Sequence, residues 1–321
     1  MLPVPQDLID FIRKGANFAV VGHEEPDGDC IGSQLAMCSL LRRMGKTAVP
    51  STAGPFRRTE IKPFKNFFLP FPAERNGLRV IVMDCSVRER VGDLPIDGLP
   101  SVAVDHHASG NPWGDIVYLD TSAPSVTFMT EKIFHALGVQ PTVEEAEWLF
   151  FGLCTDTGFF RHLDENGSEA FNTASRLAAA GVSPKKVFGM INGGKPLNSR
   201  LLLGTVLSKT KSFYGGRLLV SGETLEESER FCLESRDSDM IYQLLQSVEG
   251  VEAIVLVRQE NNEECSIGFR SRDSIDVAAI AKNFGGGGHK NASGAKVRGS
   301  IAELEEKIVA AFGETFTKYS F

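Results

Sequence analysis

The sequence predicts an α/β protein of two domains: a first domain with a mainly parallel sheet and helices on both of its faces, and a smaller α+β domain after it. Short apolar runs alternate with helical patterns through the first half of the 321 residues, as in chains built from strand–helix–strand units. Residues 181–198 are rich in Gly, Pro and Asn, which interrupt regular structure. We therefore expect the change of domain within that stretch.

In the first half, strands are expected where short runs of Val, Ile and Ala occur, and helices where apolar residues recur with a period of about 3.6. The expected strands are residues 17–22, 79–83, 101–104 and 115–119. The expected helices are residues 31–44, 125–137, 143–154 and 168–180. Because the strands and helices alternate, these strands should pair mainly in parallel.

The second half has a different pattern, which begins with a hairpin around two glycines. Its expected elements are strands over 211–214 and 217–221, helices over 225–233 and 238–248, strands over 251–258 and 265–270, a helix over 276–284, a four-glycine loop over 285–288, one more strand, and a helix over 301–312. The predicted domains are residues 1–185 and 211–321, joined by a linker and connecting helix over residues 186–210, with the active-site cleft between the two domains.

The charge balance argues against a protein that grips long nucleic acids. The chain has 34 Lys and Arg residues against 41 Asp and Glu residues, a formal charge of −7, whereas binding along a polymer of phosphates usually needs a basic surface. From this charge balance we expect a small anionic substrate that is held by a few cationic side chains. The hydrophobic content of 42% is ordinary for a folded protein.

Six cysteines occur and none of them form a C-x-x-C pair, so neither a zinc knuckle nor a thioredoxin-type site is expected. We interpret them as reduced thiols of a cytoplasmic protein. Cys30, Cys85 and Cys154 lie within two positions of candidate site residues, and we expect them to be small packing residues. The alternative is that oxidation of these thiols inactivates the protein. No run of about 18 apolar residues occurs, so no membrane span is expected.

Polar side chains follow three of the expected strands. His23, Asp27 and Asp29 come after the first strand, Asp84 after the second, and the Asp-His-His of residues 105–107 after the third. Functional groups collect at the carboxyl ends of parallel strands, because these ends meet at one edge of the sheet. We therefore expect these side chains to lie close together.

The types of side chain predict a metal site. Asp156, after the helix over residues 143–154, adds a fourth carboxylate to Asp27, Asp29 and Asp84, so about four negative charges would enter one cleft. Two divalent cations would neutralise them, and mixed carboxylate and imidazole donors suit hard or borderline cations. The sequence therefore predicts two divalent metal ions, with Mn²⁺ preferred and Mg²⁺ or Co²⁺ as the alternatives.

The order of these motifs resembles that of the DHH phosphoesterases. The chain has H-x-x-P-D-G-D at residues 23–29, an isolated Asp84 after an apolar strand, D-H-H at residues 105–107 and T-D-T-G at residues 155–158. F-R-S, which begins at Phe269, and the later G-G-G-G-H resemble the DHH-associated domain of the same family. The resemblance covers nearly the whole chain, and its nearest subgroup is the bacterial nanoRNase type, which implies a hydrolase with exonuclease and phosphatase activity.

The resemblance also implies roles for individual residues. One metal ion would be held by His23, Asp27, Asp84 and Asp156, and the other by Asp29, Asp84, His106 and Asp156. His107 would face the scissile phosphate, and Asp105 would orient the histidines. The implied reaction is in-line hydrolysis by water, with the metal ions stabilising the charge on the attacking and leaving oxygens.

The second domain is expected to hold the substrate. Consecutive glycines allow a backbone to approach an anion closely and to present N–H groups to it, and an arginine can hold a phosphate through two hydrogen bonds. The residues expected to bind a phosphate or a nucleotide end are Arg270, Ser271, Gly286, Gly287, Gly288 and His289. A cleft that contained these residues and the metal ions would favour short substrates.

These features lead to one preferred function and to alternatives. We expect a metal-dependent phosphoesterase that hydrolyses short oligoribonucleotides, 3′-phosphoadenosine 5′-phosphate, or both, to mononucleotides. The first alternative is a phosphodiesterase of cyclic or linear dinucleotides such as c-di-AMP and pApA; a pyrophosphatase is disfavoured, because the related pyrophosphatases lack the G-G-G-G-H domain. A non-catalytic nucleotide-binding regulator is also disfavoured, because every matching metal position is present. The expected partners are short RNA oligonucleotides or small nucleotides and no membrane, and a homodimer is an expectation from the resemblance alone.

Overall fold

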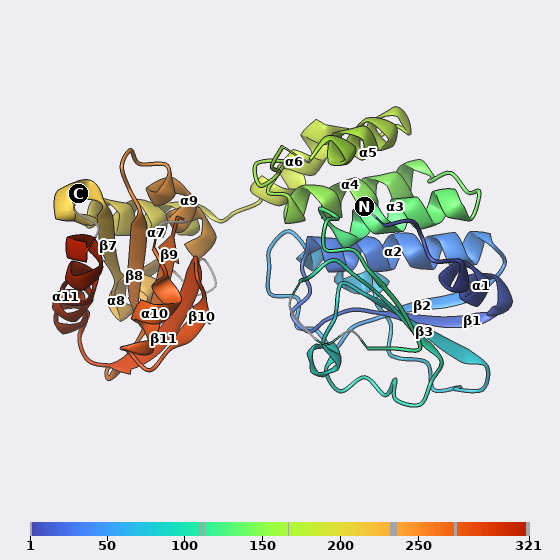
Figure 1. Ribbon diagram of the computed structural model, residues 1–321, viewed down its shortest axis with the longest axis horizontal. Coiled ribbons are helices and arrows are strands. Elements are labelled where there is room, and N and C mark those ends of the chain that lie inside the picture. Colours follow the sequence, from blue (N-terminus) through green and yellow to red (C-terminus); the bar gives the residue numbers. More distant parts are fainter. Residues whose placement is uncertain are drawn as a thin grey trace. The chain divides into compact units, whose positions relative to one another are not determined.

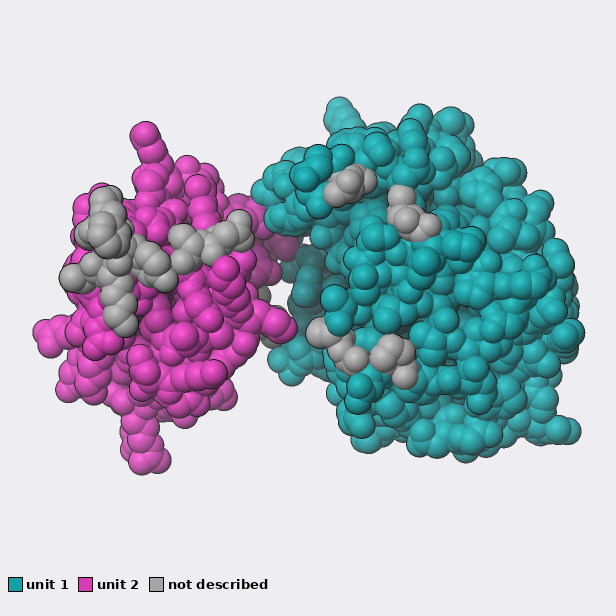
Figure 2. Space-filling view, viewed as in Figure 1, with its two compact units in different colours: residues 1–194 teal, residues 195–321 magenta. Residues whose placement is uncertain are grey.

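The structure of the protein is a computed structural model, and it describes residues 2–108, 111, 113–165, 167–231, 236–272 and 275–318. Contacts between residues divide the chain into two compact units, Met1–Gly194 and Lys195–Phe321, which are coloured separately in Figure 2. The division falls within the stretch for which the sequence predicts a linker and a connecting helix. Each unit has its own sheet and its own core, so each is described by itself.

The sheet of the first unit has five parallel strands in the order β2-β1-β3-β4-β5. The strands are β1 (Asn17–Val21), β2 (Thr47–Ser51), β3 (Leu78–Met83), β4 (Ser101–Asp105) and β5 (Ile116–Leu119). This confirms the expected parallel sheet. Short runs of β-branched residues form these strands because such side chains pack well on a pleated surface.

Helices flank this sheet, and Figure 1 shows α2, α3 and α4 lying along one side of it. The helices are α1 (Gln6–Lys14), α2 (Gly28–Arg43), α3 (Val126–Ala136), α4 (Val143–Asp156), α5 (Ser168–Ala179) and α6 (Pro184–Asn192), and the 3₁₀ helices are η1 (Lys62–Phe67) and η2 (Arg88–Val91). Helix α2 lies against both α3 and α4, so most of its surface is buried.

Alternation along β1 decides which side chains enter which core. Phe18 and Val20 enter the larger core, together with apolar residues of α1, α2, α3 and α4. Ala19 and Val21 face the other side of the sheet, where the smaller core includes Val91 of η2. Because both faces are covered, β1 reads in the sequence as a continuous apolar run rather than an alternating one.

The register of the sheet brings the ends of β1, β3 and β4 side by side. Val21 lies opposite Val82, and Met83 lies opposite Val104. Because these strands are parallel, the segments that follow them leave the sheet along the same edge. The candidate site forms at that edge.

The second unit contains a six-stranded mixed sheet in the order β10-β11-β9-β8-β7-β6, in which β7 and β8 are parallel and the other neighbours antiparallel. Its strands are β6 (Lys211–Phe213), β7 (Leu218–Glu223), β8 (Ala253–Gln259), β9 (Glu264–Ser271), β10 (Gly287–His289) and β11 (Ala292–Arg298). Its helices are α7 (Leu197–Ser208), η3 (Tyr214–Gly216), α8 (Leu225–Phe231), α9 (Ser238–Gln246), α10 (Val277–Lys282) and α11 (Ile301–Lys318). One face packs against α10 and α11, and the other against α7, α8 and α9. This confirms the expected mixed domain.

Helix α1 and strand β2 of the first unit were not expected from the sequence, nor were the short 3₁₀ helices η1 and η2. Strand β2 contains Pro50 and lies at the edge of the sheet, beside β1. A proline has no backbone N–H, and an edge strand tolerates it because one side of the strand needs no hydrogen bonds. Helix α1 begins directly after Pro5 and buries Leu8 and Ile12 against the sheet.

The expected glycine loop over residues 285–288 is wrong for its second half. Gly287–His289 forms β10, which pairs antiparallel with β11. A Cβ atom at Gly286 would lie 2.1 Å from the carbonyl oxygen of Gly294, so the close approach of two backbone segments requires glycine there. Glycine has a low strand propensity, which is why the sequence indicates a loop.

The helix expected over residues 225–233 corresponds to α8. Its last two expected positions, one of which is Cys232, lie outside the described residues. The other five cysteines, Cys30, Cys38, Cys85, Cys154 and Cys265, are buried free thiols. Within the part of the chain that the structure describes, no helix is both long and apolar enough to span a membrane.

Candidate metal centre

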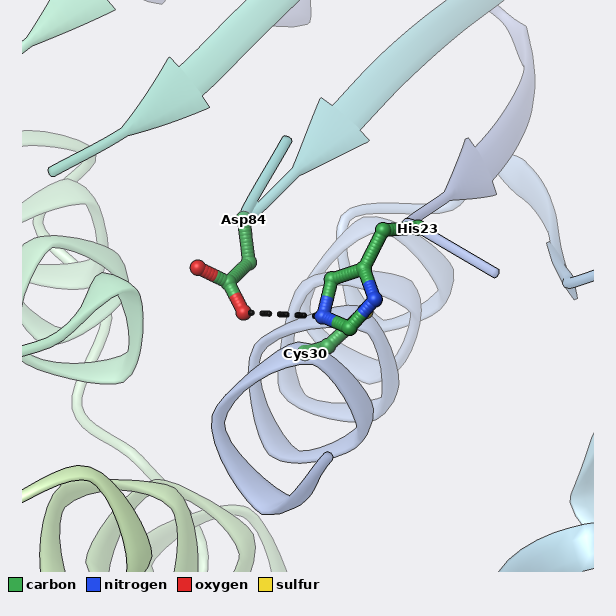
Figure 3. A group of neighbouring side chains, drawn as sticks. All are labelled: His23, Cys30 and Asp84. Atoms are coloured by element: carbon green, nitrogen blue, oxygen red, sulfur yellow. Dashed lines mark ion pairs between the residues drawn. The ribbon is translucent and has the colours of Figure 1, made fainter. Parts of the chain in front are cut away.

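His23 lies just beyond β1 and is 4% exposed. Its Nδ1 lies 2.7 Å from the carbonyl oxygen of Glu24; since a carbonyl can only accept, Nδ1 carries the hydrogen and donates. The lone pair of Nε2 is then available to a cation. Nε2 lies 3.5 Å from Oδ2 of Asp84 and 4.0 Å from Oδ1 of Asp27, and Figure 3 shows the ring directed at the Asp84 carboxylate.

Asp27 and Asp29 lie at the start of α2 and make different local contacts. Oδ1 of Asp27 accepts the backbone N–H groups of Asp29 and Cys30, each at 3.1 Å, and so caps α2. Asp29 is 1% exposed. Its carboxylate accepts the backbone N–H of Val126 at 2.5 Å and that of Thr127 at 2.8 Å, at the start of α3. Burial raises the pKa of Asp29.

Asp84 follows β3 in the left-handed backbone region, with a φ of 60°, which aspartate tolerates better than most residues. Its side chain is buried, and Oδ1 has no hydrogen-bond partner among the described residues. Burial raises the pKa of Asp84 well above its ordinary value, and the carboxylates of Asp27, Asp29 and Asp156 raise it further. A buried carboxylate oxygen without a partner is costly, and a cation would satisfy it.

The segment Asp105-His106-His107 follows β4 and folds back onto its own aspartate. Oδ1 of Asp105 accepts the backbone N–H groups of His106 at 2.7 Å and of His107 at 3.1 Å. The same oxygen lies 2.8 Å from Nδ1 of His107, and this hydrogen bond raises the pKa of His107. Burial alone would raise the pKa of Asp105, but the hydrogen bond and charge of His107 outweigh it and lower that pKa.

His106 presents one ring nitrogen to the centre. Its Nδ1 lies 3.1 Å from the carbonyl oxygen of Ala123 and donates to it. Nε2 is therefore the nitrogen with a free lone pair, and it is buried with no hydrogen-bond partner among the described residues. It lies 3.3 Å from Oδ2 of Asp156 and 3.9 Å from Oδ1 of Asp84.

Asp156 is the last residue of α4, and the chain turns sharply after it. Gly158, Phe159 and Phe160 have positive φ values of 57°, 58° and 70°, a conformation that is unfavourable for the two phenylalanines. Both of these rings pack against Phe150. Burial, together with neighbouring carboxylates, raises the pKa of Asp156 to about 8.

The side chains form three overlapping groups, and within each group the donor atoms lie within 4.8 Å of one another. The groups are His23, Cys30 and Asp84; Asp84, His106 and His107; and Asp29, His106 and Asp156. The structure therefore brings the candidate metal residues together. Asp27 belongs to none of the three groups, but its Oδ1 lies 4.0 Å from Nε2 of His23. The sequence analysis interpreted Cys30 as a packing residue, whereas its sulfur lies among these donor atoms. The acidic, partly unpartnered donor set fits divalent cations.

The candidate residues of the second unit lie on β9, β10 and the turn before β10. The strand register places Arg270, Ala292 and His289 in one row across β9, β11 and β10, so these side chains share one face of the sheet. The guanidinium of Arg270 lies 4.5 Å from the ring centre of Tyr242. Ser271 faces the opposite side, where its hydroxyl donates to a backbone carbonyl oxygen 2.7 Å away. The structure thus groups Arg270 with His289 but not with Ser271.

The glycine segment offers fewer free N–H groups than the sequence led us to expect. The N–H groups of Gly285 and Gly286 donate to the carbonyl oxygens of Lys282 and Ala281, so these two are not available to an anion. Gly287 is exposed, and a Cβ atom built there would meet no atom within 4 Å. Gly287 therefore leaves an open stretch of backbone that another molecule can approach closely.

Two family models match the chain. The model described as DHH family, N-terminal domain, matches residues 17–153, and the model described as DHHA1 domain matches residues 231–318. The first range contains every strand of the parallel sheet, and the second contains β8 to β11.

Curated relatives match over nearly the whole chain. The chain is 30% identical over 305 residues to the bifunctional oligoribonuclease and PAP phosphatase NrnA of Thermus thermophilus, covering 94% of this chain and 91% of that protein. It is 27% identical over 287 residues to the Bacillus subtilis protein of the same name, covering 86% of this chain and 87% of that protein. The cyclic-di-AMP phosphodiesterase PdeA of Listeria monocytogenes is 25% identical over 335 residues, covering 96% of this chain but 49% of that protein.

Solved structures share the fold of the chain. An exopolyphosphatase-related protein from Bacteroides fragilis matches 98% of this chain and 95% of its own chain, with a TM-score of 0.82 and 22% identity. RecJ from Thermus thermophilus, in complex with Mn²⁺, matches 98% of this chain and 54% of its own, with a TM-score of 0.53 and 14% identity. At these identities the matches show a common fold alone.

Proposed function

We propose that this chain, which belongs to the DHH family of phosphoesterases, hydrolyses short oligoribonucleotides and 3′-phosphoadenosine 5′-phosphate to mononucleotides with the help of divalent metal ions. The observation that carries this proposal concerns two buried atoms, Oδ1 of Asp84 after β3 and Nε2 of His106 after β4. Neither atom has a hydrogen-bond partner among the described residues. The relatives from Thermus thermophilus and Bacillus subtilis are named as oligoribonucleases and PAP phosphatases, which supports the choice of substrates.

The donor set supports two divalent ions. We assign one ion to His23, Asp27, Asp84 and Asp156, and the other to Asp29, Asp84, His106 and Asp156. Burial raises the pKa of Asp84 and that of Asp156, and bound cations would allow these carboxylates to ionise. Imidazole among the ligands favours Mn²⁺ over Mg²⁺, which is usually bound through oxygen atoms.

The chain's own residues prepare the phosphate for in-line attack. When bound, the ions supply Lewis acidity and lower the pKa of water. His107 has a separate role, because its side chain is 39% exposed while its Nδ1 is held by Asp105. The raised pKa of His107 keeps its ring cationic to a higher pH, so Nε2–H can donate to a phosphate oxygen. Asp105 acts through His107 and is a positioning residue.

We assign a terminal phosphate or nucleotide to the face that carries Arg270 and His289. A guanidinium binds two phosphate oxygens at once, and the ring of Tyr242 beneath it restricts the orientation of Arg270. The exposed backbone at Gly287 lies on the same strand as His289. A few cationic groups on a chain of net charge −7 suit a small anion better than a long polymer.

The test is a substrate panel assayed with Mn²⁺. The panel contains short RNA oligomers, a long RNA of related sequence, pApA, 3′-phosphoadenosine 5′-phosphate, cyclic di-AMP and pyrophosphate. Asp84→Asn removes the central charge at constant size and should lower kcat by at least about a hundredfold. Asp10→Asn, at a position of α1 whose side chain is 44% exposed, is the matched control.

The outcomes of this panel separate the candidate functions. Turnover of the short RNAs and of the bisphosphorylated adenosine, lost in Asp84→Asn, supports the proposal. Turnover of pyrophosphate alone would contradict it. Preference for cyclic di-AMP would move the chain to the second candidate, a cyclic-dinucleotide phosphodiesterase, which the similarity to PdeA over 96% of this chain favours.

A further inference from the structure

Cys30 lies inside the metal centre, although the roles proposed above leave it unused. It occupies the first turn of α2, and its N–H donates to Asp27 at 3.1 Å. A Cβ atom built at Gly22 would lie 2.2 Å from the Cys30 sulfur. The sulfur therefore lies against the residue that follows β1 and precedes His23. The side chain is therefore held at the edge of the sheet that carries the candidate ligands.

The sulfur completes a three-donor group. One ring nitrogen of His23, the Cys30 sulfur and one carboxylate oxygen of Asp84 lie within 4.8 Å of one another, and all three residues are buried. Nδ1 of His23 is occupied by Glu24, so Nε2 is the nitrogen that faces the group. Figure 3 shows Cys30 on the helix that adjoins the facing His23 and Asp84 side chains.

The Cys30 sulfur contacts the backbone N–H of His23 and the side chain of Gln34. Its hydrogen bond to Oε1 of Gln34 is 3.5 Å long. Gln34 is itself fixed, because its amide donates to the carbonyl oxygens of Val20 and Ser51 at 3.0 Å each. Oδ2 of Asp84, the oxygen that faces His23 at 3.5 Å, belongs to a carboxylate that is 2% exposed, and such a buried charge is costly unless a cation pairs with it.

We propose that Cys30 gives this position a second binding mode, in which a thiophilic divalent ion such as Zn²⁺ or Cd²⁺ is held by Nε2 of His23, a carboxylate oxygen of Asp84 and the sulfur of Cys30. Thiolate ligands select zinc-group ions, whereas Mn²⁺ and Mg²⁺ prefer oxygen donors. On coordination the thiol proton passes to water, and the fourth position of a tetrahedral ion stays open. The inference rests on the proposed function in one respect: this ion displaces the catalytic ion that shares His23 and Asp84, and so inhibits hydrolysis.

The experiment uses the full chain after removal of metal with a chelator. Titration with Co²⁺ reports a bound thiolate directly, through near-ultraviolet sulfur-to-cobalt charge-transfer absorption. Wild type should show this absorption, and Cys30→Ser and Cys30→Ala should lack it. Cys38→Ala, a buried cysteine on the same helix, is the matched control and should keep it.

Calorimetry gives the second measurement. The Zn²⁺ dissociation constant should rise by at least about tenfold in Cys30→Ser, while the Mn²⁺ constant should change much less. Charge-transfer absorption that persists in Cys30→Ser and Cys30→Ala, or its absence from wild type with Co²⁺ bound, would overturn the proposal. If neither variant folds, cadmium NMR of wild type still distinguishes a sulfur-bound ion from one held by nitrogen and oxygen alone.

These readouts separate the two proposals. A wild-type chain that binds Co²⁺ with charge-transfer absorption but hydrolyses none of the panel leaves the Cys30 site standing and removes the proposed function. A chain that hydrolyses short RNA and shows no such absorption supports the proposed function and removes the Cys30 site.

Discussion

Oδ1 of Asp105 lies 2.8 Å from Nδ1 of His107 and also accepts the backbone N–H groups of His106 and His107. One carboxylate oxygen therefore fixes both the backbone of this segment and the ring of His107. The other ring nitrogen of His107, Nε2, points away from Asp105, and the ring is partly exposed. Nε2 is therefore the nitrogen that can gain or lose a proton. The position of the proton on His107 is thus set by a residue that need not touch the substrate.

Asp105→Asn should move the alkaline limb of the pH–rate profile to lower pH. The hydrogen bond to Asp105 raises the pKa of His107, so His107 is cationic below that pKa and loses its charge as the pH rises through it. Removing the carboxylate charge lowers the pKa of His107, so the cationic form is lost at a lower pH. NMR titration of the His107 ring should shift in parallel.

The control for this change is Asp115→Asn, since Asp115 accepts the backbone N–H of Ser101 at the opposite end of β4. Its profile should keep the wild-type limb. An unmoved limb in Asp105→Asn would show that His107 is not the group that titrates.

The metal-free protein should become less stable as the pH rises from about 4 to about 8. The pKa of Asp156 is raised in the folded state from 3.8 to about 8, so between these values the folded chain binds a proton that the unfolded chain has lost. Stability then falls with rising pH, by at most about 1.4 kcal/mol per pH unit for one such group. Urea unfolding at several pH values in a chelator measures this slope.

Saturating Mn²⁺ should abolish that slope, because the bound cation favours the ionised carboxylates. Asp156→Asn should show a shallower slope without metal, since the amide does not titrate. A metal-free wild type that is more stable at the alkaline end of this range would contradict the assignment.

Phe160→Ala should weaken metal binding more than its exposure suggests. Phe160 has a φ of 70°, and such strain of about 1–3 kcal/mol persists only when packing enforces it. Here the ring packs against Phe150 and Phe159, and this packing fixes the turn that ends α4 at Asp156. We expect the Mn²⁺ dissociation constant to rise about tenfold. Calorimetric titration of Mn²⁺ checks this.

Phe171→Ala is the comparison, because Phe171 stacks on Phe160 from outside the turn and is 54% exposed. It should leave Mn²⁺ affinity near wild type. Equal losses in the two variants would mean that the aromatic cluster stabilises the unit without positioning Asp156.

Gly287→Ala should raise KM for 3′-phosphoadenosine 5′-phosphate by about tenfold with little change in kcat. A Cβ atom there meets nothing within 4 Å in the free protein, so the variant should fold normally and interfere only with a molecule that approaches the backbone. Gly286→Ala is the contrast, because its Cβ would lie 2.1 Å from the carbonyl oxygen of Gly294 and should lower the melting temperature. Unchanged KM in Gly287→Ala would remove β10 from the substrate site.

Arg176→Ala should lower the free energy of unfolding by about 1–3 kcal/mol and leave metal affinity unchanged. The carboxylate of Glu131 is 1% exposed and accepts hydrogen bonds from Arg176 at 2.6 and 3.0 Å. Removing the arginine leaves a buried carboxylate with fewer partners, although Arg176 is itself 45% exposed, which limits the loss. Chemical unfolding with and without Mn²⁺ measures both effects.

The sequence predicted the centre of the parallel sheet well, because β1, β3 and β4 are buried on both faces and read as nearly unbroken apolar runs. It also placed His23, Asp84 and Asp105 at one edge, since parallel strands end together. Strand β2 was not predicted because it contains Pro50. Proline argues against a strand except at the edge of a sheet, and the sequence does not show which strand lies at the edge. Strand β10 was not predicted because glycine is rare in strands, and the close approach of β11 that requires glycine at Gly286 and Gly288 depends on tertiary structure.

The chemical identity of the donors was predictable, but their local contacts were not. That Cys30 points into the centre follows from the start of α2 against the end of β1, which no spacing in the sequence reveals. The use of the Ser271 hydroxyl within its own unit likewise depends on which face of β9 it occupies.

The contacts of Asp29 affect how mutagenesis of this centre should be interpreted. Its carboxylate accepts the first N–H groups of α3, at Val126 and Thr127, while its own N–H donates to Asp27. It thus joins the starts of two helices that lie far apart in the chain. A loss of activity after substitution of Asp29 would be ambiguous, because ligand removal and helix displacement occur together. Asp84 accepts no such backbone N–H in the described structure, so it is the better diagnostic position.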